Sequence, residues 1–260
     1  MIKFSVCLDT LLTEYPFVER AKKAKDLGFS AVEFWFHDKD EDINEFGNLC
    51  RKEGIEVACF VVNSPTGDIG GTLVNPEDRG RYISRLKDLI PLAHNLNCKT
   101  LITCAGNTME NKTYEQQYNS ILDSLWEASK IVEKEGITLV LEPLNTLVDH
   151  KGYFLDSAIK GAEIVRKINH PNIKLLYDIY HMQIMEGNII SFIEKNLDII
   201  GHFHSASVPG RNELWLGELN YKNILERIYS LGYKGYIGLE YFPTMSSEES
   251  LKRLKEFFRG

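Results

Sequence analysis

The sequence has no long apolar run. None of its 260 residues belongs to an uninterrupted apolar stretch near the ~20 residues that a membrane-spanning helix requires. The opening segment, MIKFSVCLDT, also lacks the long apolar core and the small-residue cleavage site of a secretory signal. We therefore expect no membrane partner and a cytoplasmic location.

Cysteine is scarce and scattered. The chain has five cysteines, and no two of them form a CxxC pair. An odd number of dispersed thiols argues against a disulfide framework. Free cysteine usually behaves as a small buried hydrophobic residue. We therefore expect buried core thiols at Cys7, Cys50, Cys59, Cys98 and Cys104.

Clustered basic residues are also missing. The formal net charge is −7, and we find no lysine and arginine cluster of the kind that binds nucleic acid. A protein that binds nucleic acid usually needs a basic face to neutralise phosphates. The charge pattern therefore predicts no nucleic-acid partner and favours a small-molecule substrate.

The composition is that of an enzyme-sized globular chain, with 43% hydrophobic and 26% charged residues. This length supports one large core and is short for two domains. No linker and no shift in composition marks a boundary. We expect a single domain that spans residues 1–260.

Short β-rich segments alternate with helical patterns, and several patterns stop at a glycine, as at Gly28 and Gly136. Strands are expected at residues 2–9, 31–36, 56–63, 100–106, 138–145, 173–181, 199–207 and 236–243. Helical segments are expected at residues 16–28, 43–54, 76–97, 114–136, 156–168, 189–197, 220–232 and 247–260.

The strand segments are rich in valine, isoleucine and leucine and do not alternate cleanly with polar residues. Such strands are typical of a parallel sheet that helices cover. No GxGxxG turn follows the first strand, so an open doubly wound sheet is disfavoured. Eight strand and helix units predict an α/β fold, the (β/α)8 TIM barrel.

Four successive strands carry an ionisable residue where the apolar pattern ends. These residues are Glu142, Asp178, His204 and Glu240. Loops at the carboxyl ends of barrel strands build the active site in this fold. Parallel strands of similar register would bring the four side chains to one level of the barrel mouth. The plain alternative is that each is an ordinary polar residue beside a loop.

Three carboxylates and an imidazole that converge in a buried place need a positive partner, because each unpaired buried charge costs several kcal/mol. A divalent cation bound by the four residues would supply it. The oxygen ligands favour Mn²⁺ or Mg²⁺, and the imidazole makes Co²⁺ a further choice.

Two further side chains are candidates for binding the substrate. His181 follows Asp178 by three residues, and Arg211 lies in the VPGR loop after the seventh strand. The arginine could bind an anionic or hydroxylated substrate through its planar fork. A hydrogen-bonded loop histidine and a surface arginine are the alternatives.

The two glutamates suggest a chemistry. If a substrate carbonyl and its neighbouring hydroxyl both ligate the cation, the adjacent C–H becomes acidic. Glu142 or Glu240 could remove that proton while the other returns it. Such a pair would catalyse isomerisation or epimerisation through an enediolate.

Several segments resemble the xylose-isomerase-like barrels and most closely the hydroxypyruvate isomerase family. The resemblance covers most of the chain, and its longest and most specific motif is YDIYHMQIMEG. The other segments are LLTEYPFVERAKKAKDLGFSAVEFWF, LEPLNT, GYFLDS, VPGR, GELNY and GLEYFP.

The resemblance implies that Glu142 and Glu240 transfer the proton and that Asp178 and His181 match the DxxH of the family. Hydroxypyruvate would then interconvert with tartronate semialdehyde. His204 departs from the pattern, since hydroxypyruvate isomerases often carry glutamine there and ketose 3-epimerases carry a metal-binding histidine. By the same resemblance we expect a homodimer or homotetramer.

Three other functions stay open at this point. A ketose 3-epimerase would use the same residues on a longer sugar, and a non-catalytic sugar-binding barrel would need no paired glutamates. The barrel endonucleases that act at abasic DNA need extra histidines after the third and fourth strands. This chain has Asn63 and Gly106 there, and its charge disfavours DNA. Glu33, near the second strand, is a weaker match to the family, and Trp35 and Phe36 could form a pocket wall. An ordinary role in the core is the alternative for all three.

Overall fold

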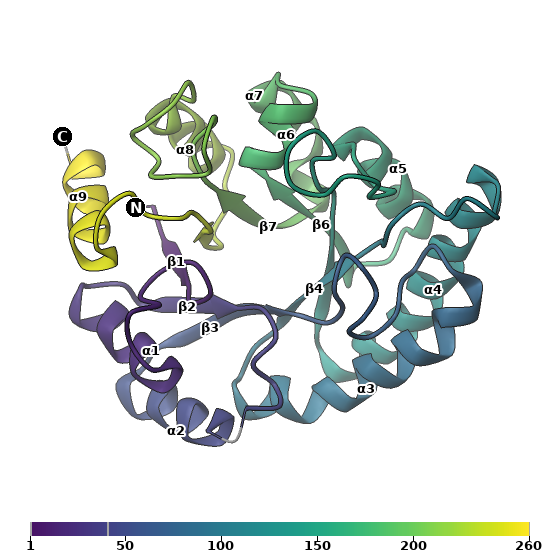
Figure 1. Ribbon diagram of the computed structural model, residues 1–260, viewed down its shortest axis with the longest axis horizontal. Helices are drawn as coiled ribbons and strands as arrows, with labels where there is room; N and C mark the ends of the chain where they lie inside the picture. The colour runs from purple at the N-terminus through teal and green to yellow at the C-terminus, as the bar shows by residue number, and fades with distance from the viewer. Residues whose placement is uncertain (1, 41, 260) are drawn as a thin grey trace.

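The computed structural model describes residues 2–40 and 42–259. Eight parallel strands form a closed barrel inside a ring of helices (Figure 1). Each strand pairs with the next in chain order, and β8 returns to pair with β1. The predicted TIM barrel is therefore confirmed.

The strands lie where the sequence places them and are shorter at their carboxyl ends. They are β1 Phe4–Cys7, β2 Ala31–Phe34, β3 Glu56–Val61, β4 Thr100–Cys104, β5 Thr138–Glu142, β6 Ile173–Asp178, β7 Ile200–Ser205 and β8 Ile237–Leu239.

The helices also match their expected segments, except α6 (Ile179–Met185), which was not predicted. They are α1 Phe17–Asp26, α2 Ile43–Glu53, α3 Arg79–Asn95, α4 Tyr114–Glu135, α5 Ala158–Ile168, α6 Ile179–Met185, α7 Ile189–Asn196, α8 Tyr221–Ser230 and α9 Ser247–Arg259, with 3₁₀ turns η1 Pro76–Asp78 and η2 Leu197–Ile199. Gly260, the last residue of the expected terminal helix, lies outside the described residues.

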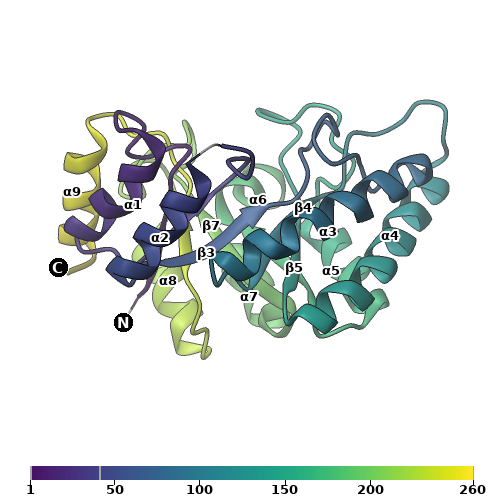
Figure 2. The ribbon, with the colours of Figure 1, turned by 90° about the horizontal axis from the view of Figure 1, so that it is seen from below.

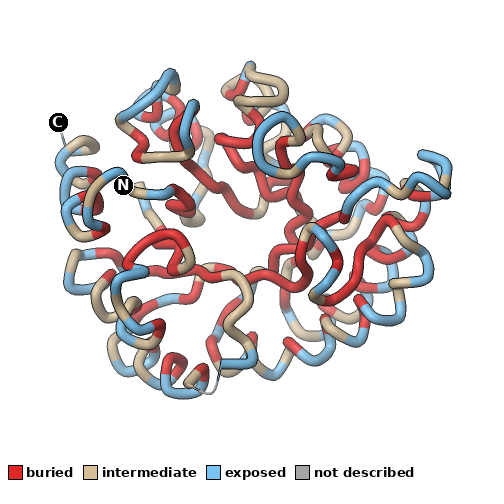
Figure 3. The backbone as a smooth tube through the Cα atoms, viewed as in Figure 1, coloured by how far each residue is buried: buried red, intermediate tan, exposed pale blue. Residues whose placement is uncertain are grey.

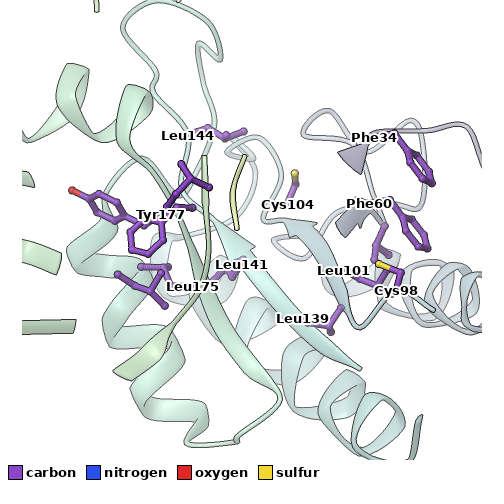
Figure 4. Packing of buried hydrophobic residues seen from close by; sticks show 14 of the residues in the cluster. Phe34, Phe60, Cys98, Leu101, Cys104, Leu139, Leu141, Leu144, Leu175 and Tyr177 are labelled. Carbon is purple, nitrogen blue, oxygen red and sulfur yellow. The ribbon is translucent and has the colours of Figure 1, made fainter. Parts of the chain in front are cut away.

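The strands are apolar throughout because both of their faces are covered. Outward-facing residues pack against the helices, as Figure 4 shows for Phe34 and Phe60, whose stacked ring centroids are 5.2 Å apart. Burying one such side chain contributes about 1.5–3 kcal/mol. Inside the barrel a second, smaller apolar cluster joins five residues of four strands, Cys59, Val61, Ile102, Val140 and Leu176.

Local signals fix where helices begin and end. The side chain of Thr113 accepts the backbone N–H of Gln116, and Gln116 returns a bond to the backbone N–H of Thr113, so α4 begins with a capping box. The same helix ends at Gly136, whose φ of 63° lies in the left-handed region that glycine adopts without cost. The stop predicted at Gly136 is confirmed.

One expected strand is too long. Residues 173–181 were expected to form a strand, but β6 ends at Asp178 and α6 begins at Ile179. The side chain of Asp178 accepts the backbone N–H groups of Tyr180 and His181, and such an N-cap favours helix initiation. The acid therefore changes the chain from strand to helix at the barrel mouth.

The buried residues follow the strands at the centre of the molecule, and the exposed residues face outward from the helices (Figure 3). Figure 2 shows the amino terminus below the barrel and long loops above it. All five cysteines are free and buried, as predicted. None of the helices in the described part of the chain combines the length and apolarity needed to cross a bilayer.

Candidate functional site

The structure brings together the four residues that the sequence predicts as metal ligands. Asp178 and His204 are paired in register across β6 and β7, while Glu142 ends β5 and Glu240 directly follows β8. One ligand atom from each of the four lies within 4.8 Å of the others. All four side chains are buried.

The His204 imidazole lies at the centre of this group. Its Nδ1 is 3.5 Å from Glu142 Oε1 and 3.5 Å from Glu240 Oε2. Among the described residues this nitrogen has no hydrogen-bond partner of good geometry. The two glutamates therefore flank a buried nitrogen that is available to a ligand.

Burial and neighbouring charges shift the pKa values of three residues in this group. Burial alone would lower the pKa of His204, but the negative charges of Glu240 and Glu33 hold it well above the usual value. Burial alone would raise the pKa of Glu240, but the positive charges of His204 and Arg211 hold that pKa well below its usual value. Burial, together with the charge of Glu240, raises the pKa of Asp178 to about 7.

These residues fit a divalent cation. Carboxylate oxygens and one imidazole nitrogen form a hard donor set that suits such an ion. Burial and the charge of Glu240 both oppose the ionised form of Asp178, and a bound cation would offset both. Nδ1 of His204, which has no partner of good geometry among the described residues, would release its proton to bind such an ion. The group could therefore hold a metal ion.

His181 lies beside this group in the first turn of α6. Its Nδ1 accepts the backbone N–H of Asn145 at 3.2 Å, so we assign the ring proton to Nε2. Burial lowers the pKa of His181 well below the usual value, which keeps the ring neutral. The Nε2–H donor lies 3.5 Å from Asp178 Oδ2 and finds no good hydrogen-bond geometry within residues 2–40 and 42–259.

Arg211 reaches the group from the loop after β7. Its Nη2 pairs with Glu240 Oε2, and its guanidinium lies over the ring of Tyr180, 5.0 Å from the centroid. Its Nε is buried and has no partner in the described part of the protein. The arginine thus retains donor capacity beyond its ion pair with Glu240.

A cavity of about 230 Å³ opens at these side chains. Its apolar wall includes Trp35 and Phe36, which settles these two aromatic residues as pocket wall. The indole Nε1 of Trp35 also donates to Glu240 Oε1 at 2.8 Å. The lining residues are Trp35, Phe36, Val61, Pro65, Ile102, Cys104, Glu142, Leu144, His150, His181, His204, Arg211 and Glu240.

The structure adds residues that the sequence analysis did not select. His150 lines the cavity, and its ring centroid is 5.4 Å from that of His181. It lies in the loop after β5, away from a strand end, and no sequence signal marks it. His202 and Glu33 contact each other inside the barrel. The period of two in a strand, which puts His202 on the same face as His204, could have identified the first of them.

The family model described as xylose isomerase-like TIM barrel matches residues 21–259. The putative hydroxypyruvate isomerase of Danio rerio is 32% identical over 270 residues, which cover 100% of this chain and 96% of that protein. The hydroxypyruvate isomerase of Escherichia coli (strain K12) is 32% identical over 256 residues, which cover 97% of this chain and 98% of that protein.

The 2-oxo-tetronate isomerase of Pectobacterium atrosepticum is 31% identical over 258 residues, and the match covers 96% of each chain. Among solved structures, a protein from Brucella melitensis described as AP endonuclease, family 2 is 30% identical. Its TM-score is 0.92, and the match covers 99% of each chain.

Proposed function

Because the chain belongs to the xylose isomerase-like TIM barrel family, we propose that it is an isomerase that interconverts hydroxypyruvate and tartronate semialdehyde (2-hydroxy-3-oxopropanoate). The names of two of the relatives, in Escherichia coli and Danio rerio, support this activity. The observation that carries the proposal is the pair of buried glutamates, Glu142 and Glu240, on either side of His204. We also propose that residues 1–260 form one barrel domain.

Glu142, Asp178, His204 and Glu240 would hold a divalent cation, Mn²⁺ or Mg²⁺ by the oxygen donors or Co²⁺ by the added imidazole. When bound, such a cation supplies Lewis acidity that acidifies the C–H beside the substrate carbonyl and stabilises the negative oxygen that forms. The ligand set rests on the burial of all four side chains within 4.8 Å of one another.

The reaction moves one proton between neighbouring carbons. One glutamate of the pair removes a proton from C3 of hydroxypyruvate, and the electron pair of that bond forms the C2–C3 double bond of an enediolate. The other glutamate delivers a proton to C2, and the hydrogen of the C3 hydroxyl passes to the oxygen on C2, so that C3 becomes the aldehyde and C2 carries the new hydroxyl. Two carboxylates on opposite sides of the reacting carbons make both transfers short.

Arg211 and His181 would bind the oxygens of the substrate. The unpartnered Nε of Arg211 lies in the buried part of the site, and a guanidinium binds a carboxylate through parallel N–H groups. The neutral His181 would donate its Nε2–H to a substrate oxygen. The loop residue His150 lines the same cavity as Glu142 and Glu240. It is a third nitrogen-bearing side chain that could bind a substrate oxygen.

Changing Arg211 to lysine tests whether the substrate is an acid. Lysine keeps the positive charge but lacks the planar guanidinium fork. We expect KM for hydroxypyruvate to rise by about 10- to 100-fold, because roughly one hydrogen bond to the charged carboxylate is lost. Initial rates measured across substrate concentrations give this value. The matched control is Arg85→Lys, because Arg85 is bonded to Asp38 and does not line the cavity.

An unchanged KM in the Arg211→Lys variant would contradict carboxylate binding by Arg211. The neutral substrate dihydroxyacetone separates the remaining outcomes, since it has no carboxylate to lose. An equal loss on both substrates would assign Arg211 to the orientation of Glu240, with which it forms an ion pair.

A second candidate substrate is 2-oxo-tetronate, which the relative in Pectobacterium atrosepticum favours by its name. Its C3 carries a hydroxyl beside the C2 carbonyl, so the same proton shift applies. The cavity of about 230 Å³ has room for either acid. The names of the relatives favour these acids over the longer sugars of a ketose 3-epimerase.

DNA cleavage is the least supported alternative. Asn63, at the position where the endonucleases need a histidine, donates to the carbonyls of Gly71 and Cys104 and accepts from Thr103 and Cys104. These bonds use the amide to join β3 to β4 and its neighbouring loop. The net charge of −7 also opposes phosphate binding.

We propose a cytoplasmic location and a homodimer or homotetramer for this protein. The five free cysteines are compatible with a reducing compartment. Apolar side chains are exposed on the loops that follow the strands, among them Leu147 and Phe242, and such side chains favour contact with another subunit.

A further inference from the structure

A second polar cluster lies inside the barrel, beneath the proposed metal centre. Its central residue is Glu33 on β2, whose side chain is 3% exposed. An ionised carboxylate in such a place is costly unless other groups compensate it. Three groups that can donate a hydrogen bond face Glu33, namely the hydroxyl of Ser5 and the imidazoles of His202 and His204. These neighbours can compensate an ionised carboxylate.

The two oxygens of Glu33 have different neighbours. Oε2 accepts the hydroxyl of Ser5 at 2.6 Å, lies 3.0 Å from His202 Nε2 and accepts the weak thiol donor of Cys59 at 3.6 Å. Oε1 lies 3.2 Å from His204 Nε2, and among the described residues neither atom has a hydrogen-bond partner of good geometry. The first oxygen thus anchors the carboxylate to the barrel, and the second faces the proposed metal ligand.

The neighbouring strand β8 leaves room for Glu33 and His204. Gly238 on β8 is paired in register with His204. A Cβ at Gly238 would lie 2.3 Å from Glu33 Oε1 and 2.6 Å from His204 Cδ2. Any side chain at this position would therefore push the carboxylate and the imidazole out of place.

We propose that Glu33 is a positioning residue that faces His204 Nε2 and, once a metal ion is bound, accepts its N–H, so that the imidazole is held with Nδ1 turned toward Glu142 and Glu240. A metal-bound histidine commonly donates its other N–H to a carboxylate, which fixes its tautomer and its orientation. The inference rests on the proposed function, because it takes the upper group as the metal centre. Two neighbours support this role: Ser5 donates its hydroxyl to Glu33, and Gly238 leaves space for the carboxylate.

The competing use of this cluster is a second cation site. Glu33, Cys59, His202 and His204 also place one ligand atom each within 4.8 Å of the others. One observation favours the positioning role: Oε2 of Glu33 already receives the hydroxyl of Ser5 and the weak thiol donor of Cys59.

The test is calorimetric titration of the metal-stripped protein with Mn²⁺ or Co²⁺, for the wild type and for Glu33→Gln. Glutamine keeps the size of the side chain and removes its charge. We expect one ion per wild-type chain and a rise in Kd of about 10- to 100-fold in the variant. Glu213→Gln is the matched control, because Glu213 is buried and hydrogen-bonded to Thr244, away from His204. Its Kd should equal that of the wild type.

A double-mutant cycle separates positioning from general stability. In a His204→Gln background the Glu33→Gln change should have no further effect on Kd, because the imidazole that it positions is gone. If Glu33→Gln does not fold, Gly238→Ala displaces the same pair by steric contact and should weaken binding likewise. A merely structural role would lower the melting temperature and leave the Kd of the folded protein unchanged.

The outcomes distinguish this inference from the function on which it rests. A wild-type chain that binds no ion would contradict the metal centre and this inference with it. One ion per chain with equal Kd in wild type and Glu33→Gln would overturn only the role of Glu33. Two ions per chain, reduced to one by Glu33→Gln, would also overturn it and identify the lower cluster as a cation site.

Discussion

Replacing Glu240 with glutamine is expected to lower kcat about a thousandfold, because an amide can neither take nor return a proton, and positioned acid–base catalysis contributes 10²- to 10⁴-fold. Glutamine keeps the length of the side chain, and its carbonyl can still accept the indole N–H of Trp35. Ligand binding should therefore largely persist. The measurement is kcat at saturating metal beside calorimetric binding of the substrate.

The control for this prediction is Glu213→Gln. Glu213 is a buried carboxylate in the loop between β7 and α8, and it does not line the cavity. We expect its kcat to match the wild type. A kcat in Glu240→Gln within a few-fold of the wild type would falsify the paired-base assignment. A wild type and a Glu240→Gln variant that both bind the ligand and do not turn it over would identify a non-catalytic sugar-binding barrel.

Changing Asp178 to asparagine is expected to weaken metal binding by at least about 100-fold and to reduce turnover to a similar extent, because removing a charged ligand exceeds the 10- to 100-fold loss typical of an outer partner. The fold should persist. Asparagine is as good an N-cap as aspartate, so it can still accept the backbone N–H of Tyr180 that Asp178 Oδ1 accepts at 2.7 Å.

Alanine at the same position separates the two roles of Asp178. It removes the ligand and the cap together, so its free energy of unfolding should fall by about 1 kcal/mol more than that of the asparagine variant. Thermal unfolding of the metal-free variants gives this difference, and calorimetry gives the metal affinity. Asparagine with wild-type metal affinity would show that Asp178 only caps α6.

Much of the fold could be predicted from the sequence, because the signals are local and repeated. Both faces of each strand are covered, so the strands are apolar segments between glycine-terminated helices such as the one that ends at Gly136. The carboxyl ends were harder to place. The apolar character of YIGLEYFP continues to residue 243, but β8 ends at Leu239, because the residues beyond it leave the barrel and become loop.

The site was predictable where its residues end strands, as with Glu142 and Asp178. Parallel strands carry such ends to one face of a barrel, so the register did not have to be known. The cap formed by Asp178 was missed because the apolar residues after it, Ile179 and Tyr180, suit a strand as well as a helix. The side-chain cap of Asp178, which accepts the backbone N–H groups of Tyr180 and His181, favours the helix.

The cluster beneath the site was not predictable from the sequence. Glu33 and His202 are 169 residues apart, and only closure of the barrel brings β2 and β7 to a common interior. A buried glutamate near a strand end gives the same sequence pattern whether it serves the core or the site. Distances to His204 are what distinguish the two uses.

The most direct test of metal-assisted isomerisation by this protein is to measure turnover after its metal is stripped and again after Mn²⁺, Mg²⁺ or Co²⁺ is restored. The substrates are hydroxypyruvate, 2-oxo-tetronate and a panel of ketoses such as fructose and tagatose, with products followed by NMR. We expect metal-dependent conversion of hydroxypyruvate to tartronate semialdehyde and little conversion of the six-carbon ketoses. Turnover that survives metal removal, or that favours the ketoses, would contradict the proposed function.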